Sequence, residues 1–136
     1  MARRALPLAA ALPLLAAVAA VPVTAAPSGA VRATAPSEVL KQGTCSRHSV
    51  WKITMNNSDG PIEVAFEVDQ GKVGAAWHVT LKHNGHLYYS GMQKTLAPDG
   101  SFEVNRLVKN LRGVDTIKAV ATNRATGETC VAKASF

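Results

Sequence analysis

The sequence has only two cysteines, and it lacks the patterns that would indicate a helical domain or a membrane span. Neither Cys45 nor Cys130 stands in a recognisable nucleophile motif, so a cysteine-dependent enzyme is not expected. From Val39 onwards no 3.6-residue hydrophobic period is present, which argues against a helical fold. The apolar N-terminal segment has no proline-free run of the ~20 residues that a membrane-spanning helix needs.

The N-terminus has the three-part pattern of a secretory signal peptide. Residues 1–4 are basic, residues 5–23 are rich in Ala, Leu and Val, and small residues precede the predicted cleavage after Ala25. The alternative is a retained membrane anchor, but Pro7, Pro13 and Pro22 interrupt the segment. The sequence therefore predicts export, with a signal peptide over residues 1–25 and no membrane span after cleavage.

The remaining chain divides into a linker and one domain. Residues 26–38 are rich in Ala, Pro, Ser and Thr and show no period, which is typical of a disordered linker. Residues 39–136 form one domain of common size. The whole chain has a net charge of +6; without Arg3 and Arg4 the mature chain has 13 basic and 9 acidic residues, or +4. This charge suits weak attraction to anionic polymers or cell envelopes.

The two cysteines are expected to form a disulfide, because export leads to an oxidising compartment. A Cys45–Cys130 bond would close a loop over most of the domain. Loop-closure entropy assigns such a bond about 4–5 kcal/mol of stabilisation. Two free thiols are the alternative.

Alternation of apolar and polar residues predicts strands throughout the domain. The clearest run is residues 62–68, IEVAFEV, and the next, residues 75–82, centres on Trp77, which is expected to anchor the core. Gly91 predicts a bulge or bend, and Arg106, on an inward parity, indicates that its strand leaves the core there. Further runs span residues 39–45, 49–55, 87–95, 102–108, 117–122 and 130–136. Seven or eight short strands separated by turns predict an all-β, antiparallel sandwich.

Asn84-Gly85 predicts a β-hairpin with two alternative registers. A two-residue loop would pair His83 with His86. A three-residue loop, residues 83–85, would place Leu87 and Tyr89 on the core face and turn Tyr88 outward. The second register buries more apolar side chains, so we expect it.

The domain resembles an immunoglobulin-like sandwich. Residues 62–68, Trp77 and residues 115–119 stand where that fold has its second strand, its third-strand Trp and the corner before its sixth strand. The corner has Ile117 in place of the usual Tyr, and no cysteine pair joins the second and sixth strands.

The whole chain resembles a group of small, uncharacterised exported proteins of high-GC Gram-positive bacteria. That resemblance covers the mature domain and implies no known activity. The matching segments are residues 43–45, 62–69, Trp77, 84–85, 100–104, Asp115 and 126–130.

Histidines and aromatic residues are the best candidates for a ligand surface. His78, His83 and His86 cluster around one hairpin, but a zinc site needs three or four ligands and no further one is assigned. Solvated hairpin histidines are the simpler interpretation, and no metal or other cofactor is expected. A platform for sugar rings or a peptide could be formed by Trp51, Tyr88 and Tyr89 together with Lys52, Lys82 and Lys94. Trp51 could instead cap the core.

Two groups of acidic and polar residues have simpler explanations than a catalytic site or a calcium site. Glu63, Glu67 and Asp69 share one strand face, at a spacing that could serve acid–base catalysis, but a polar outer face is expected on any such sheet. Residues 57–60 and 69–71 could offer oxygen ligands to calcium, yet turn formation explains both.

The sequence therefore predicts a secreted, non-catalytic binding module, extracellular or envelope-associated, whose partner is a cell-envelope polymer or a secreted protein. Nucleic acid is not an expected partner, because the charge is modest and no basic stripe is evident. The alternative is a small inhibitor of an exported enzyme, with a rigid loop at residues 110–115 or 96–100. A hydrolase is a third hypothesis, for which no catalytic constellation is found.

Overall fold

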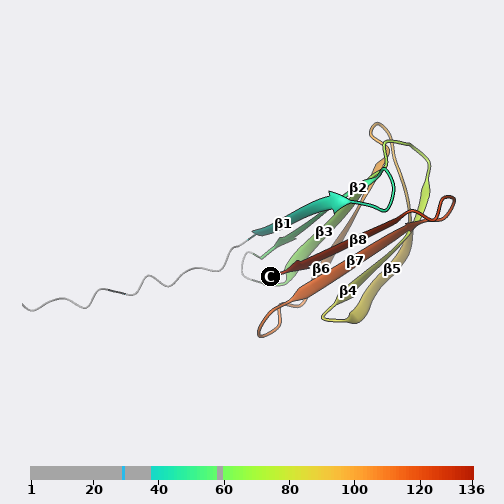
Figure 1. Ribbon diagram of the computed structural model, residues 1–136. Coiled ribbons are helices and arrows are strands. Elements are labelled where there is room, and N and C mark those ends of the chain that lie inside the picture. The colour runs from blue at the N-terminus through green and yellow to red at the C-terminus, as the bar shows by residue number, and fades with distance from the viewer. Residues whose placement is uncertain (1–28, 30–37, 58–59) are drawn as a thin grey trace, which may run out of the picture. The chain divides into compact units, whose positions relative to one another are not determined.

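The computed structural model describes Gly29, residues 38–57 and residues 60–136 (Figure 1). The predicted signal peptide and almost all of the predicted linker lie outside these residues. Glu38, assigned to the linker, already belongs to the first strand. Among the described residues, no helix is long and apolar enough to cross a membrane.

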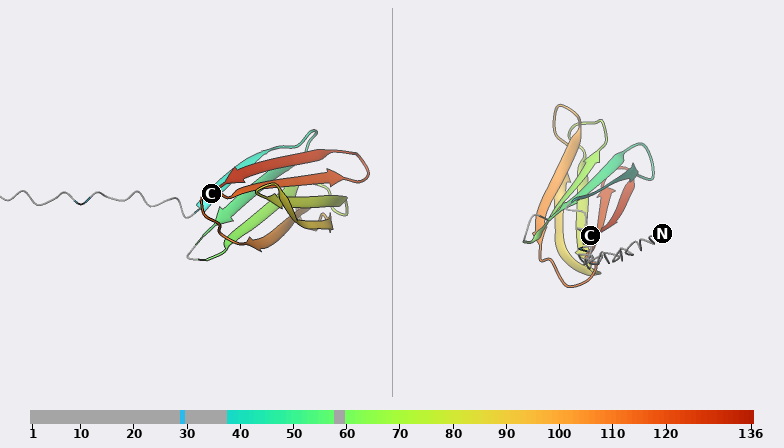
Figure 2. Two further views of the ribbon diagram at one scale, coloured as in Figure 1. Left: turned by 90° about the horizontal axis from the view of Figure 1, so that it is seen from below. Right: turned by 90° about the vertical axis from the view of Figure 1, so that its left-hand side faces the viewer.

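Within the described residues eight strands make two four-stranded antiparallel sheets, which confirms the all-β prediction (Figures 1 and 2). Sheet A has the order β1-β2-β3-β6 and sheet B the order β5-β4-β7-β8. The chain crosses between the sheets after β3, β5 and β6, so each sheet combines distant segments. The strands are β1 (Glu38–Thr44), β2 (Val50–Asn56), β3 (Ile62–Asp69), β4 (Ala76–His83), β5 (His86–Lys94), β6 (Ser101–Val108), β7 (Thr116–Asn123) and β8 (Thr129–Ser135).

The core lies between the sheets and is built from the inward residues of the alternating strands. Trp77 on β4 is 0% exposed, as predicted, and its ring packs against Phe102 at 6.1 Å. Its indole N–H donates to Gln70 Oε1 at 3.0 Å. The Asn123 amide donates to the same oxygen at 3.3 Å, so one loop side chain satisfies two groups on sheet B.

The β4–β5 hairpin has the two-residue loop, so the expected three-residue register is wrong. His83 pairs with His86, and Leu87 is 58% exposed rather than in the core. Asn84 and Gly85 have φ values of 47° and 84°, which suit a tight two-residue hairpin turn. The Asn84 side chain also accepts a hydrogen bond from the Thr116 N–H at 2.8 Å, which holds the turn against β7.

A β-bulge then restores the expected register from Tyr89 onward, but not for Leu87. The register shifts between Leu81 and Lys82, so Tyr88 is the extra residue and Tyr89 lies opposite Leu81. The irregularity is therefore not at Gly91, where it was predicted. Gly91 instead makes room for the Tyr89 ring, since a Cβ there would lie 2.5 Å from the tyrosine oxygen.

Arg106 does not mark the point where β6 leaves the core. Val108, two residues later, is still buried. The exposed Arg106 guanidinium lies 4.2 Å from the centre of the Tyr89 ring, a cation–π contact at the side of the sandwich where β5 approaches β6.

The predicted disulfide joins Cys45, just after β1, to Cys130 on β8. A second tie lies beside it: the Glu128 carboxylate accepts hydrogen bonds from Ser49 N at 2.8 Å and Ser49 Oγ at 2.9 Å. Burial raises the pKa of Glu128, but bonds from Ser49 and from the Arg47 and His48 backbone outweigh it, and the pKa is lowered overall. The carboxylate is therefore held in its charged form.

The β3–β4 and β5–β6 loops pack together at one end of the sandwich. Gln70 N donates to Gly100 O at 3.1 Å, and Thr95 Oγ1 donates to Lys72 O at 2.6 Å. Gly100 has φ 74°, and a Cβ on it would lie 2.3 Å from the Lys72 nitrogen. Only glycine fits this contact.

Candidate ligand surface

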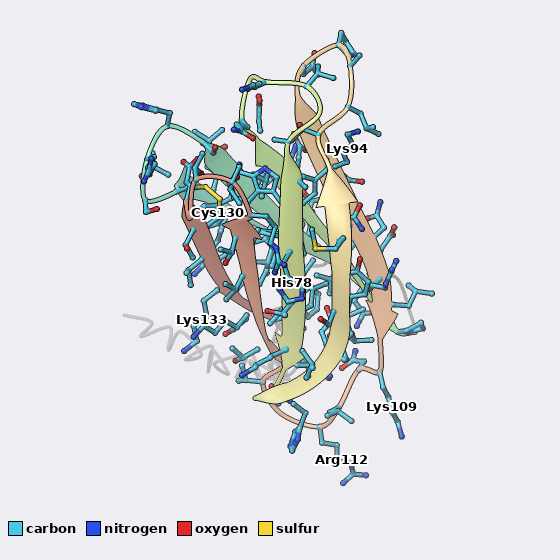
Figure 3. All side chains as sticks on the ribbon, turned by 90° about the vertical axis from the view of Figure 1, so that its right-hand side faces the viewer. His78, Lys94, Lys109, Arg112, Cys130 and Lys133 are labelled. Carbon is cyan, nitrogen blue, oxygen red and sulfur yellow. A yellow bond between two sulfur atoms is a disulfide. The ribbon has the colours of Figure 1, made fainter. Side chains whose placement is uncertain are left out.

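The outer face of sheet B, here the lysine face, carries no carboxylate. Its residues follow from the strand registers, because every second residue points outward. They are Ala76, His78, Thr80 and Lys82 of β4, Leu87, Ser90, Met92 and Lys94 of β5, Thr116, Lys118, Val120 and Thr122 of β7, and Thr129, Val131, Lys133 and Ser135 of β8. Figure 3 shows His78 on β4, with Lys133 and Lys94 to either side of it.

Three of these lysines stand directly opposite one another on neighbouring strands. Lys82 pairs with Lys118, and Lys118 pairs with Lys133. Adjacent strands lie about 4.8 Å apart, so the three Cα atoms form a line roughly 10 Å long across β4, β7 and β8. All three side chains are exposed, and within residues 38–57 and 60–136 none forms an ion pair. We call Lys82, Lys118 and Lys133 the lysine row.

Small polar and aliphatic side chains border the lysine row. On one side Thr80, Val120 and Val131 form the next line of cross-strand partners, and Val131 is 48% exposed. On the other side Thr116 and Ser135 are hydrogen-bonded to each other at 2.9 Å. The lysines thus stand between hydroxyl groups and short apolar surfaces, with no anionic neighbour on the same face.

The outer face of sheet A has the opposite character. Glu63, Glu67 and Asp69 do point to one side, as the sequence predicted, and Glu103 lies opposite Glu67 on β6. Here the one lysine is paired: Lys52 Nζ lies 2.6 Å from Glu67 Oε2. The hydrogen bond and the charge of Glu67 raise the pKa of Lys52. The two outer faces therefore differ in sign.

Trp51 lies beside a shallow hollow at the end of sheet A. The hollow has a volume of about 510 Å³ and is lined by Gln42, Gly43, Thr44, Val50, Trp51, Lys52, Glu67 and Asp69. The Trp51 ring lies on Gly43, since a Cβ on that glycine would fall 2.6 Å from the ring. It also packs against the core, which supports the simpler prediction that Trp51 caps it.

Tyr88 does not point outward, so that expectation is wrong. The bulge turns it toward the interior, where it packs against the core and meets the His83 ring edge-on at 6.4 Å. Its hydroxyl is buried without a hydrogen-bond partner among the described residues. This burial raises the pKa of Tyr88 to about 12, with a smaller opposing effect from Arg106. Tyr88 is therefore unsuited to an exposed platform.

The hairpin histidines have separate environments. His83 Nε2 lies 2.6 Å from Oδ1 of the buried Asp115, and Asp115 Oδ2 accepts from Leu111 N at 3.1 Å. His78 Nε2 lies 3.0 Å from Ser90 Oγ on the lysine face, and His86 is exposed. Among the residues described, no group of three or more His, Cys, Asp or Glu side chains is placed to hold a metal ion.

The loop between β6 and β7 is anchored by the same Asp115. Its backbone N–H and C=O both pair with Phe136 at the C-terminal end of the sheet, at 3.2 and 2.9 Å. Beyond this anchor Leu111 is 43% exposed and Val114 68% exposed, and Arg112 projects from the end of the molecule (Figure 3). The loop therefore exposes apolar and basic side chains while Asp115 holds its backbone in place.

The lysine row was not predicted from the sequence, which singled out Lys82 but neither Lys118 nor Lys133. Each of its members stands on an outward parity, which the alternation already shows. Lys82 and Lys118 are far apart in sequence, however, and their alignment depends on β4 pairing with β7. The available signal was the absence of any Asp or Glu from the outward positions of these strands.

Comparison of the chain with protein-family models, with curated proteins and with solved structures found no match.

Proposed function

We propose that this protein is a secreted, non-catalytic binding module, extracellular or associated with the cell envelope, whose ligand surface is the lysine face. The observation that carries the proposal is the absence of carboxylates from that face, set against the acidic outer face of sheet A. A face with unpaired positive charge attracts anionic ligands from a distance and concentrates them locally.

The roles of the titratable groups support a non-catalytic protein. Asp115, the buried partner of His83, also holds the backbone of the β6–β7 loop. Glu128 is occupied with Ser49. Neither Asp115 nor Glu128 lines the hollow beside Trp51. Glu67 and Asp69 do line it, but Glu67 is paired with Lys52 and Asp69 accepts from the Gly71 N–H, so these carboxylates also have structural partners.

We also propose that the protein is exported and that its sandwich is immunoglobulin-like. The Cys45–Cys130 disulfide is compatible with an oxidising, secreted location, in line with the predicted signal peptide. The strand order supports the fold: β3, β4 and β7 stand as the expected second, third and sixth strands, with Trp77 on β4.

Retention on insoluble cell-wall polymers and on immobilised secreted proteins tests the proposed function. Residues 26–136 should be retained more strongly than an unrelated basic protein of equal net charge. Equal release of both proteins at the same salt concentration, from every matrix, would contradict a binding role.

A second candidate function, inhibition of an exported enzyme, is favoured by the β6–β7 loop. Exposed Leu111 and Val114 on a loop held by Asp115 suit insertion into a partner's cleft. The protein should then inhibit at least one of a panel of secreted hydrolases at micromolar concentration. A Leu111→Ala/Val114→Ala variant should lose that inhibition and keep its fold, and no inhibition by the parent protein would dismiss the candidate.

A further inference from the structure

We propose that the lysine row is a binding site for a linear polyanion that runs across β4, β7 and β8. This inference rests on the proposed function and names the chemistry of the ligand. The three lysines provide positive charges in a straight line, and the face around them carries nothing that neutralises them.

The fold itself does not require this arrangement. Like charges directly opposite each other on neighbouring strands destabilise a sheet. Lys118 has a lysine on both sides, so it carries this cost twice. Sheet A shows the favourable alternative, with Lys52 opposite and bonded to Glu67.

Protection of sheet edges explains only part of the pattern. Lysines on edge strands discourage pairing between molecules. Lys133 on β8 and Lys94 on β5 stand on the two edges of sheet B. Lys82 and Lys118 stand on the central strands β4 and β7, where both neighbouring strands are already paired. Solubility requires charge on this face, but it does not require that every charge have one sign.

The geometry of the row selects the ligand class. Strand spacing places the lysine Cα atoms about 4.8 Å apart, so the flexible side chains can meet anionic groups that recur at roughly that interval or somewhat more. A lysine ammonium binds as a point charge rather than through a planar fork, and the row contains no arginine. Single charged groups joined by short linkers therefore fit it.

The borders of the row suit such linkers. Thr116 and Ser135 provide hydroxyl groups on one side, and Val120 and Val131 provide aliphatic surface on the other. Phosphodiester-linked polymers and polycarboxylates share this chemistry: one negative charge per repeat on a flexible backbone. A single small anion would meet only one or two of the three lysines.

Salt dependence gives the expected magnitude. A flexible polyanion that contacts three lysines releases counterions, with a slope of log K against log salt of about −2. Affinity should therefore fall about 20-fold when the salt concentration rises from 50 to 200 mM.

The test uses residues 26–136 and two triple variants of equal charge. The row variant is Lys82→Gln/Lys118→Gln/Lys133→Gln. The matched control is Lys41→Gln/Lys72→Gln/Lys109→Gln, which removes three exposed lysines outside the face. The probes are poly(glycerol phosphate), which is phosphodiester-linked, and poly-L-glutamate, with uncharged dextran as the blank. Binding is measured by titration calorimetry at several salt concentrations.

We expect the row variant to lose at least 20-fold in affinity and the control less than 3-fold. The row variant should also unfold at an unchanged or higher temperature, because repulsion is relieved. Tighter binding of poly(glycerol phosphate) or of polyglutamate identifies the phosphodiester or the carboxylate source. Should the row variant aggregate, the single Lys118→Gln variant should still weaken binding and flatten the salt slope.

Equal losses in both triple variants would overturn the inference, because net charge alone would then explain binding. Unchanged binding by a folded row variant would overturn it as well. The cell-wall retention assay separates the two proposals. If the row variant is still retained, the lysine row is not the ligand site, and the proposed binding function stands. If the lysine row binds polyanions but the protein is not retained on cell-wall polymers or secreted proteins, the proposed binding function fails and the lysine-row site stands.

Discussion

Replacing Glu128 by Gln should destabilise the domain, because it removes a buried charge to which Ser49 donates two hydrogen bonds. The carboxylate accepts from both the N–H and the hydroxyl of Ser49, at 2.8 and 2.9 Å, and fixes the turn that follows Cys45. Hydrogen bonds to a charged group contribute about 1.5–3 kcal/mol each, and a buried donor left unpaired costs a similar amount.

The expected loss for Glu128→Gln is about 2–4 kcal/mol, because the amide oxygen can keep one bond while the NH₂ group faces the other donor. In a domain of this size 1 kcal/mol shifts the unfolding midpoint by about 4–8 °C, so the midpoint should fall by roughly 8–32 °C at neutral pH. Thermal unfolding followed by circular dichroism, with the disulfide intact, measures it.

The pH dependence of the same variant provides an independent check. The folded-state pKa of Glu128 is lowered, so its contribution is present above the ordinary carboxyl pKa and is lost as the pH falls through the folded-state value. The gap between the wild-type and Glu128→Gln midpoints should therefore be widest at neutral pH and narrow on acidification.

Glu63→Gln is the matched control, since Glu63 is exposed on the outer face of sheet A. It should change stability by no more than about 0.5 kcal/mol. A loss for Glu128→Gln no larger than that of this control would show that the bonds to Ser49 do not stabilise the fold. A gap between Glu128→Gln and the wild type that does not depend on pH would show the same of the charge.

Three further substitutions test other contacts, each by thermal unfolding. Gly100→Ala should lower the free energy of unfolding by at least about 2 kcal/mol more than Gly113→Ala does. Both residues have positive φ, but only Gly100 lies against another backbone segment, at Lys72. Equal losses would show that the two loops separate freely. Tyr88→Phe should leave stability unchanged or raise it by about 1 kcal/mol, because it removes a buried hydroxyl that has no partner among the described residues. The variant should also lose the tyrosine absorbance titration near the raised pKa of about 12. A clear loss of stability would mean that the hydroxyl is hydrogen-bonded. Gln70→Ala should cost about 2–4 kcal/mol, since an indole N–H and an amide lose their shared acceptor, and a loss below about 1 kcal/mol would mean that water replaces it.

The β5 part of the candidate surface depended on one register, that of the β4–β5 hairpin, which local rules did not settle. Counting buried apolar residues favoured a three-residue hairpin loop, whereas the structure keeps the tight Asn84-Gly85 turn and inserts a bulge at Tyr88. Turn geometry and core packing were both satisfied, at the expense of regular pairing. Tyr88 consequently moved inward and Leu87 outward.

The strands, the parity of most side chains and the core position of Trp77 could be predicted from the sequence, because alternation is a property of neighbouring residues along one strand. The two cysteines were also enough to predict the disulfide. Which strands are neighbours could not be predicted in this way and follows from the tertiary fold. The lysine row needs β4 beside β7 and β7 beside β8, and the Glu128 tie needs Ser49 to approach from the far end of the chain. Cross-strand pairing and the burial of a carboxylate are long-range events, so no local period in the sequence encodes them.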